Sequence, residues 1–571
     1  MSGTEHALIA RLRGLPGAGR VETDARRNEH YRRGFRSGSG AALAVVFPET
    51  LVGLWRVLQA CVDAGVIIIL QAAKTGLTEG SAPSGDDYDR PVVVINVLAL
   101  DGLRLLNGGH QVLALPGATL HGLESRLKAI GRAPHSVIGS SCLGASVIGG
   151  VANNSGGALV KRGPAYTEMA LYAQVTAEGR LELVNHLGIE LGDAPETMLQ
   201  RLADGDFRCD GLDDGGFQAS DREYAERLRD VDADTPARYN ADVRRLYEAS
   251  GCAGKLAVFA VRLDTFAVPA QDRTFYIGTN DAQVLTRLRR HLLSRFTHLP
   301  DVGEYLHREA FDIAERYGKD TFVAIQKLGT ARMPRLFAAK GRIDATLNKL
   351  DFLPRDLSDR LLQFGSQCLP QHLPGRMLDF RERHEHHLIL KMSDAGIAEA
   401  QAFLPAFFAD PANEGDFFEC TPEEAAQAYL HRFAVAGAAI RLQTVRSAEV
   451  GGLIALDIAL RRNDVDWVER LPPAIADQIE HTLIYGHFLC HVFHQDYVLK
   501  KGADVDAVKH AMLELLDGRG AKYPAEHNVG HLYEAEPGLQ GFYRRLDPTN
   551  TFNPGIGKTD RRHRRHCLCA A

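Results

Sequence analysis

Three histidines lie close together in the stretch YGHFLCHVFHQDY, and a glutamate–histidine pair follows downstream. They are His487, His491 and His494, with Glu526, His527 and His531 following in PAEHNVGH. Two imidazoles seven residues apart, together with a carboxylate, form a donor set that suits zinc or a similar divalent ion. Imidazole also titrates near neutral pH, so a histidine here could accept a proton in catalysis. Isolated histidines are more often structural, and both interpretations stay open at this point.

Two glycine-rich loops, each beside an apolar strand, form the second group of residues that could bind a ligand. The first is VIIILQAAKTGLTEGS at 66–81, and the second is GSSCLGASVIGGVANNSGG at 139–157. Glycine lets backbone N–H groups approach a pyrophosphate without obstruction by side chains. Neither loop is a P-loop, because no G-K-[ST] follows, and neither carries G-x-G-x-x-G. Tight turns would explain either loop alone, but the two together favour a dinucleotide ligand.

Composition excludes several classes of protein. With 571 residues the chain needs two or three domains. Its net charge of -6 argues against a nucleic-acid binder. Nine cysteines without CxxC pairs argue against a disulfide framework or a zinc ribbon. The sequence shows no signal peptide and no apolar window long enough to span a bilayer. These features predict a protein that is cytosolic or attached to the cytosolic side of a membrane.

Strand and helix patterns alternate from about residue 41 to 267, which predicts an α+β or α/β domain. The acidic, glycine-rich stretch 209–240 is expected to be a surface excursion. Residues 316–391 differ in charge, with 14 Lys and Arg against 8 Asp and Glu and apolar residues between them. This pattern is typical of peripheral attachment to anionic lipid, although a solvated helical face explains it equally well. From 392 to 516 the pattern is α/β again, with a helix in EEAAQAYLHRFAVAGAAIR, and the tail RRHRRHCLCAA is basic.

The two loops, together with YRRGFRSG, RGPAYTEM and KYPAEHNVGHLY, resemble the FAD-linked oxidases with the vanillyl-alcohol-oxidase-type fold. The likeness extends almost end to end. It implies an α+β protein whose FAD-binding domain has two subdomains, with an α/β cap domain and a basic helical membrane-binding segment. The implied ranges are 1–267 for the FAD-binding domain, 268–315 and 392–516 for the cap, 316–391 for the membrane-binding segment, and 517–571 for a return to the FAD-binding domain through DPTNTFNPGIGK.

The resemblance also implies the residues that contact FAD. They are Ala72, Ala73, Lys74, Thr75, Gly76, Gly80 and Ser81 in the first loop, Gly139, Ser146 and Gly156 in the second, and Val258. Lys74 stands where the family more often has Asn, which puts one side-chain contact in doubt but not the backbone cradle. The first loop contains no histidine, so FAD is expected to be held noncovalently.

FAD-dependent 2-hydroxyacid dehydrogenases carry a similar histidine pattern, H-x-G-D-G-N-x-H followed by E-H-G. In that family the two histidines and the glutamate hold a metal, and the next histidine is the base. Here the spacing of His487 and His494 and the pair Glu526–His527 match, whereas the G-D-G-N insert and the last glycine do not. The resemblance therefore implies His527 as catalytic base, with His487, His494 and Glu526 around the substrate, and leaves a divalent metal open. A substrate carboxylate also needs an arginine, for which Arg36, Arg441, Arg461 and Arg462 are candidates.

The implied activity is FAD-dependent oxidation of D-lactate to pyruvate, with electrons passed to a membrane quinone. The implied partners are D-lactate, the quinone and an anionic lipid surface that binds 316–391, with no nucleic acid. The implied place is the cytoplasmic side of a bacterial inner membrane, as a peripheral protein. Two alternatives remain: a dehydrogenase of another D-2-hydroxy acid, and a catalytically silent flavin- and lipid-binding protein.

Overall fold

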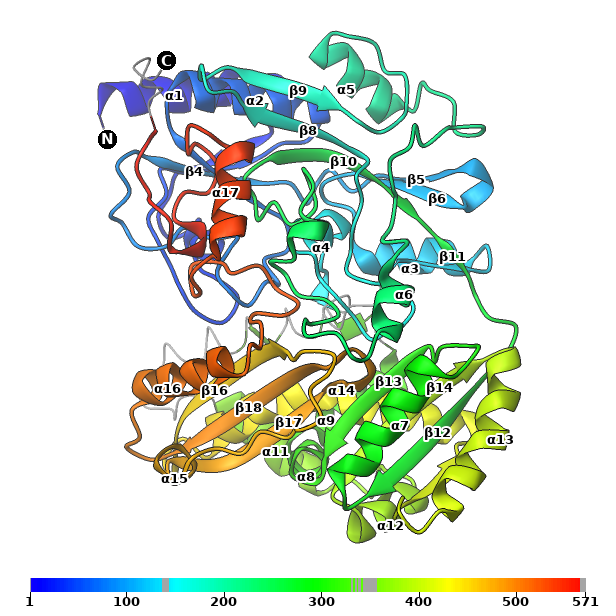
Figure 1. Ribbon diagram of the computed structural model, residues 1–571. Coiled ribbons are helices and arrows are strands. Elements are labelled where there is room, and N and C mark those ends of the chain that lie inside the picture. The colour runs from blue at the N-terminus through cyan, green and yellow to red at the C-terminus, as the bar shows by residue number, and fades with distance from the viewer. Residues whose placement is uncertain are drawn as a thin grey trace.

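The computed structural model describes residues 2–135, 143–329, 332–333, 336, 340–341, 343 and 357–564. The chain forms two lobes (Figure 1). The first and the last described residues lie in the N-terminal lobe, and a seven-stranded sheet forms the centre of the other lobe, which we call the cap. Gly139, which was predicted to contact FAD, lies outside the described residues, as does most of 330–356. Among the described residues, no helix is long and apolar enough to cross a membrane.

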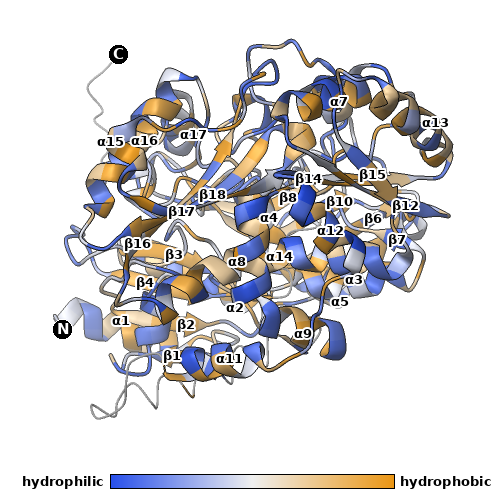
Figure 2. Ribbon diagram, turned by 90° about the horizontal axis from the view of Figure 1, so that it is seen from below, coloured by the Kyte–Doolittle hydropathy of each residue, from blue (hydrophilic) through white to orange (hydrophobic). Residues whose placement is uncertain are grey.

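The N-terminal lobe begins with a four-stranded sheet in the order β1-β2-β4-β3, in which β2, β4 and β3 are parallel. The strands are β1 (Arg20–Glu22), β2 (Ala44–Phe47), β3 (Ile67–Gln71) and β4 (Val92–Asn96). Apolar, mostly β-branched residues favour β2, β3 and β4 because β-branched side chains pack well on a pleated surface, and Figure 2 shows hydrophobic colour on these three strands. Helix α2 (Leu51–Asp63) connects β2 to β3, and Thr50 caps its N-terminus.

A second, antiparallel sheet of the same lobe has the order β5-β6-β10-β8-β9. Its strands are β5 (Leu103–Leu106), β6 (Gln111–Ala114), β8 (Ala170–Val175), β9 (Leu181–Asn185) and β10 (Ala257–Asp264). Helices α3 (Leu120–Lys128) and α4 (Val147–Ala152) pack against it through a shared apolar cluster. The two sheets carry the two glycine-rich loops, the first after β3 and the second around α4.

The cap sheet is antiparallel, in the order β15-β12-β14-β13-β17-β18-β16. Its strands are β12 (Asp272–Thr279), β13 (Val302–His307), β14 (His386–Ser393), β15 (Asp416–Glu419), β16 (Val450–Ala459), β17 (Ile479–His487) and β18 (Val492–Lys500). Helices α7 (Ala282–Ser294), α13 (Ala395–Ala409) and α16 (Val505–Gly518) share one apolar cluster with the sheet. Helices α8 (Arg308–Tyr317), α9 (Lys319–Leu328), α12 (Gly375–Arg383) and α14 (Pro422–Val445) share the cluster on its other face.

Two expectations about the middle of the chain need revision. The boundary predicted at residue 391 falls inside β14, which pairs with β12 and β13 near the centre of the cap sheet. The stretch 209–240 is not a surface excursion throughout, because Tyr224 and Arg238 are buried at 0% and 2% exposure. Composition misled there because the acidic and glycine residues lie mainly in its first half. The helix predicted in EEAAQAYLHRFAVAGAAIR is confirmed as α14.

After α16 the chain returns to the N-terminal lobe, where α17 (Pro537–Leu546) packs beside β10 (Figure 1). The segment 551–553 then runs alongside β3: the Ile68 N–H donates to the Thr551 carbonyl at 3.0 Å, and the Asn553 N–H donates to the Ile68 carbonyl at 2.9 Å. The N-terminal lobe is thus built from both ends of the chain. As a result, residues 519–536 run along the boundary between the lobes.

Candidate active site

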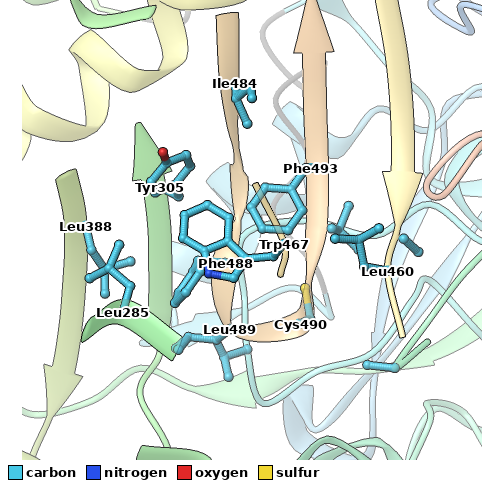
Figure 3. Close-up of a cluster of buried hydrophobic side chains, with 14 of the residues drawn as sticks. Leu285, Tyr305, Leu388, Leu460, Trp467, Ile484, Phe488, Leu489, Cys490 and Phe493 are labelled. Carbon is cyan, nitrogen blue, oxygen red and sulfur yellow. The ribbon is translucent and has the colours of Figure 1, made fainter. Parts of the chain in front are cut away.

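The β17–β18 hairpin carries two of the predicted site residues on one face and an aromatic core on the other. Successive strand residues point to opposite faces, so Phe493 of β18 turns away from its neighbour His494. Phe488 follows His487 in the short turn between the two strands and belongs to the same apolar cluster as Phe493. Their rings pack on Trp467 at 4.9 and 5.4 Å between centroids, and Figure 3 shows these rings together with Tyr305. This packing fixes the hairpin and therefore the backbone from which both histidines project.

Each of these histidines faces a carboxylate on the neighbouring strand. Glu304 of β13 lies directly opposite His487 of β17, and its Oε1 is 2.5 Å from His487 Nδ1. Asp457 of β16 lies directly opposite His494 of β18, and its Oδ1 is 3.4 Å from His494 Nδ1. The two imidazole rings lie 5.5 Å apart between centroids. Four adjacent strands thus place carboxylate, histidine, histidine and carboxylate side by side.

Glu526 reaches this row from the segment between the lobes. Its Oε2 lies 3.3 Å from His487 Nε2, and its Oε1 accepts a hydrogen bond from Arg238 Nη2 at 2.5 Å. Its backbone N–H donates to Asp457 Oδ2 at 2.7 Å. One ligand atom from each of His487, His494 and Glu526 lies within 4.8 Å of the others. The structure therefore brings together the three residues that the sequence proposed around the substrate.

The charges in this site are strongly coupled. Burial disfavours the imidazolium of His487, but Glu304 and Glu526 outweigh that effect and raise its pKa to about 10. Burial opposes ionisation of Glu526, but His487 and Arg238 hold its pKa well below the usual range. Without another cation, His487 is thus protonated between two carboxylates. A divalent ion could take the place of that proton.

His527 lies next to this cluster, with its Nε2 3.8 Å from Asp457 Oδ2. Burial lowers the pKa of His527, against the opposing effect of Asp457, so the neutral imidazole is favoured. The other two histidines of the predicted group take no part. His491 is buried at the hairpin turn with its Nδ1 3.0 Å from the Arg461 carbonyl, and His531 Nδ1 lies 3.3 Å from the Gly555 carbonyl.

Asn528 connects His527 to both glycine-rich loops. Its amide donates to Asn153 Oδ1 of the second loop, and its Oδ1 accepts from Thr78 Oγ1 of the first loop at 3.3 Å. A Cβ on Gly80 would lie 2.7 Å from Asn528 Oδ1, and one on Gly156 would lie 2.2 Å from Glu526 Oε1. At both predicted FAD contacts a side chain would therefore collide with the segment that carries Glu526 and Asn528.

The loops leave room for a dinucleotide. A Cβ added to Gly76 or Gly144 would meet no atom within 4 Å, so these backbones border open space. The predicted contacts in the first loop are all half-buried, namely Ala72, Ala73, Lys74, Thr75, Gly76, Gly80 and Ser81. Ser146 caps α4 by accepting from the Gly149 N–H at 3.0 Å, and Val258 of β10 belongs to the apolar cluster beneath it. These residues fit FAD lying between the loops and the cap.

Lys74 has a structural role that its sequence position did not reveal. Its Nζ donates to the His30 carbonyl and, at 3.0 Å, to the Arg33 carbonyl, while its backbone takes a left-handed φ of 56°. Burial lowers its pKa to about 8. The side chain therefore ties the first loop to the segment that carries Arg36.

The four arginines considered for binding a substrate carboxylate differ in their ion-pair partners. Arg441 pairs with Asp320 and Asp359, at 3.0 and 2.8 Å, within the helical layer of the cap. Arg461 and Arg462 are engaged with residues of 230–235. Arg36 forms no ion pair with any carboxylate in the described part of the chain. Its charge nevertheless reaches Asp496, whose pKa is raised by burial and lowered in part by Arg36.

Sequence reasoning missed four residues of this site: Glu304, Asp457, Arg238 and Asn528. Glu304 and Arg238 are separated from Glu526 by more than 200 residues, and only strand pairing or lobe contact brings them to it. Asn528 could have been found from the sequence, because it stands where the E-H-G motif has glycine. An amide side chain at that position can form hydrogen bonds that glycine cannot.

The glycine-rich loops, the cap and the histidine cluster between them define an FAD-binding protein of the vanillyl-alcohol-oxidase type. The fold resembles the crystal structure of p-cresol methylhydroxylase with substrate bound, with a TM-score of 0.57 and 12% identity over 98% of each chain. Residues 42–184 match the FAD binding domain family.

Longer matches identify the family. Residues 274–565 match the family described as D-lactate dehydrogenase, membrane binding. The chain is 59% identical to the quinone-dependent D-lactate dehydrogenase of Escherichia coli (strain K12), over 97% of each protein. It is 56% identical to the enzyme of the same name from Haemophilus influenzae, over 97% of this chain and 98% of that one. The chain belongs to the quinone-dependent D-lactate dehydrogenases.

Proposed function

We propose that this protein oxidises D-lactate to pyruvate and passes the two electrons through FAD to a membrane quinone. The observation that carries the proposal is the position of Glu526 and His527. They lie between the two glycine-rich loops on one side and the histidine pair of the cap on the other. A hydroxy acid bound there would face both the flavin and a base. A catalytically silent flavin protein would have no need of this buried polar cluster.

The residues divide the chemistry among them. Bound FAD, held noncovalently, would accept the hydride from the C2 carbon. His527 takes up the hydroxyl proton, since its neutral form is favoured and it lies beside the cluster. Arg36 holds the substrate carboxylate, because its charge adds to the effect of burial in lowering the pKa of His527 and it has no ion-pair partner among the described residues. Asp457 Oδ2 lies 3.8 Å from His527 Nε2, so its charge favours the imidazolium that forms when His527 takes up the proton.

The donor set of His487, His494 and Glu526 fits a divalent cation of the zinc type. Such an ion would polarise the substrate hydroxyl and so ease the loss of its proton to His527. Arg238 keeps Glu526 in place whether or not the ion is bound, because it contacts the oxygen turned away from His487.

The visible spectrum of the purified protein tests this function directly. Under anaerobic conditions, D-lactate should bleach the flavin band and L-lactate should not, and a water-soluble quinone should restore the band. If neither isomer of lactate bleaches the band but another D-2-hydroxy acid does, that acid is the substrate. A protein without a flavin band, or with one that no hydroxy acid bleaches, would contradict the proposal.

We also propose that the helices of 316–391 attach the protein to anionic lipid. Helix α11 (Leu357–Gln367) exposes Leu361, Leu362 and Phe364 at 60%, 41% and 69%. Figure 2 shows hydrophobic and hydrophilic turns alternating along α9 and α11. Arg316, Lys327 and Arg360 are exposed on the same helices or next to them. Apolar side chains interleaved with cations suit a surface that enters the headgroup region.

A variant with Phe364→Ser and Leu361→Ser should bind vesicles about tenfold or more weakly, because two apolar side chains no longer enter the lipid. Sedimentation with vesicles of phosphatidylglycerol and phosphatidylcholine measures this binding. Val243→Ser is the matched control, since Val243 is 61% exposed in the N-terminal lobe. Equal binding of the double variant and the control would show that α11 does not contact lipid.

Attachment of this kind fits the reaction, because quinones reside in the bilayer. We place the protein on the cytoplasmic face of the inner membrane as a peripheral protein. Binding that persists on vesicles of phosphatidylcholine alone would argue against anionic lipid as the partner, since the exposed cations would then contribute nothing.

A further inference from the structure

Both histidines of the candidate metal site present the same ring nitrogen to a carboxylate. Glu304 Oε1 lies 2.5 Å from His487 Nδ1, and Asp457 Oδ1 lies 3.4 Å from His494 Nδ1. In each pair the two residues are direct cross-strand neighbours. The arrangement therefore follows from the register of the sheet, in which β13 and β16 flank β17 and β18.

This pattern has a known physical meaning in metal sites. A histidine that binds a metal through one nitrogen usually donates the N–H of its other nitrogen to a carboxylate or a carbonyl. The contact fixes the tautomer and the ring orientation, and it makes the coordinating nitrogen a better ligand. A carboxylate on Nδ1 leaves Nε2 free to coordinate. His487 Nε2 points to Glu526, the third member of the donor set, at 3.3 Å.

We propose that Glu304 and Asp457 are positioning residues that hold His487 and His494 with Nε2 turned to a divalent cation. The proposal rests on the metal site described under the proposed function. It extends that site from three ligands to five residues, two of which touch neither the cation nor the substrate.

Contacts behind the two carboxylates support this role. Arg432 of α14 lies 2.8 Å from Glu304 Oε2, so the other oxygen of Glu304 is held toward His487. Asp457 is held through Oδ2, which accepts the Glu526 N–H at 2.7 Å. Its Oδ1 is buried and has no hydrogen-bond partner among the described residues, although His494 Nδ1 is its neighbour. A small rotation of His494 on binding a cation would supply that partner.

Asp457 also links the metal ligands to the base. Its Oδ1 faces His494, and its Oδ2 faces both the Glu526 N–H and His527 Nε2. One carboxylate thus sets the positions of a metal ligand and of the catalytic base. Loss of Asp457 should weaken cation binding and also slow turnover directly, whereas loss of Glu304 should slow turnover only through the weaker cation binding.

Calorimetric titration with Zn²⁺ tests the proposal on the FAD-loaded protein after removal of metals with a chelator. Glu304→Gln and Asp457→Asn should each weaken Zn²⁺ binding by about 10- to 100-fold. The matched control is Glu309→Gln. Glu309 Oε1 lies 2.9 Å from Nδ1 of His481, on the same strand as His487 but outside the cluster. This control should keep the affinity of the unmodified protein.

Flavin absorbance and the thermal midpoint of the metal-free protein establish that each variant is folded. Because Glu304→Gln also removes the partner of Arg432, Asp457→Asn provides an independent test. Zn²⁺ affinity unchanged in both variants would overturn the proposal, as would an unmodified protein that binds no Zn²⁺. Neither result depends on D-lactate. The proposed oxidation of D-lactate is tested separately, by the bleaching of the flavin band.

Discussion

Replacing His527 with asparagine should slow flavin reduction by D-lactate by about 10²- to 10⁴-fold, the usual contribution of a general base. Asparagine can still occupy the position beside Asp457, but it cannot accept the hydroxyl proton. FAD should stay bound, because the adjoining Asn528 makes the contacts to both glycine-rich loops. Stopped-flow spectroscopy under anaerobic conditions measures the reduction rate, and the flavin absorbance measures the cofactor content.

His531→Asn is the matched control for this variant. His531 lies four residues further along the same segment, and its Nδ1 contacts the Gly555 carbonyl rather than the charged cluster. Burial lowers its pKa to about 4, so it stays neutral at the pH of the assay. The control should reduce its flavin at close to the rate of the unmodified protein. If His527→Asn does so too, His527 is not the base.

Local patterns in the sequence were enough to predict the parts of the fold that depend on neighbouring residues. The apolar run before the first glycine-rich loop predicted a strand, which is β3, and the stretch EEAAQAYLHRFAVAGAAIR predicted a helix, which is α14. The glycine-rich loops could be located for the same reason. The boundaries proposed for the domains stay predictions, and the one at 391 falls inside β14, because a basic charge pattern does not mark where a strand begins.

Only the site residues that belong to short sequence motifs could be predicted. His487, His494 and Glu526 could be named because they are close in sequence, and the structure brings them together. Glu304 and Asp457 could not, since each reaches its histidine through the order of strands in the sheet. For Arg238 the composition predicted an exposed position, because nothing in an acidic, glycine-rich stretch indicates that one of its arginines is buried. Lobe contact, not local preference, buries it.

Loss of the buried Arg238 should markedly lower the stability of the protein. It is 2% exposed, and its Nη2 donates to Glu526 Oε1 at 2.5 Å and to the Gly157 carbonyl at 2.7 Å. Arg238→Met keeps most of the volume but leaves Glu526 a buried carboxylate without its arginine. Breaking a buried pair in this way should lower the free energy of unfolding by about 3–5 kcal/mol. Thermal unfolding of the metal-free, FAD-loaded protein measures the loss.

A more solvated arginine shows how much less a contact of the same chemistry contributes near water. Arg461 is 34% exposed in its side chain and pairs with Asp234, which is 72% exposed, at 2.8 Å, and with Asp464 at 3.1 Å. Arg461→Met should therefore change stability by only about 0–1 kcal/mol. Arg238→Met should also slow flavin reduction by D-lactate, because Glu526 then loses the contact that orients it toward His487. A similar thermal midpoint for the two variants would mean that the buried Arg238–Glu526 pair contributes no more than a solvated pair, and this prediction would be wrong.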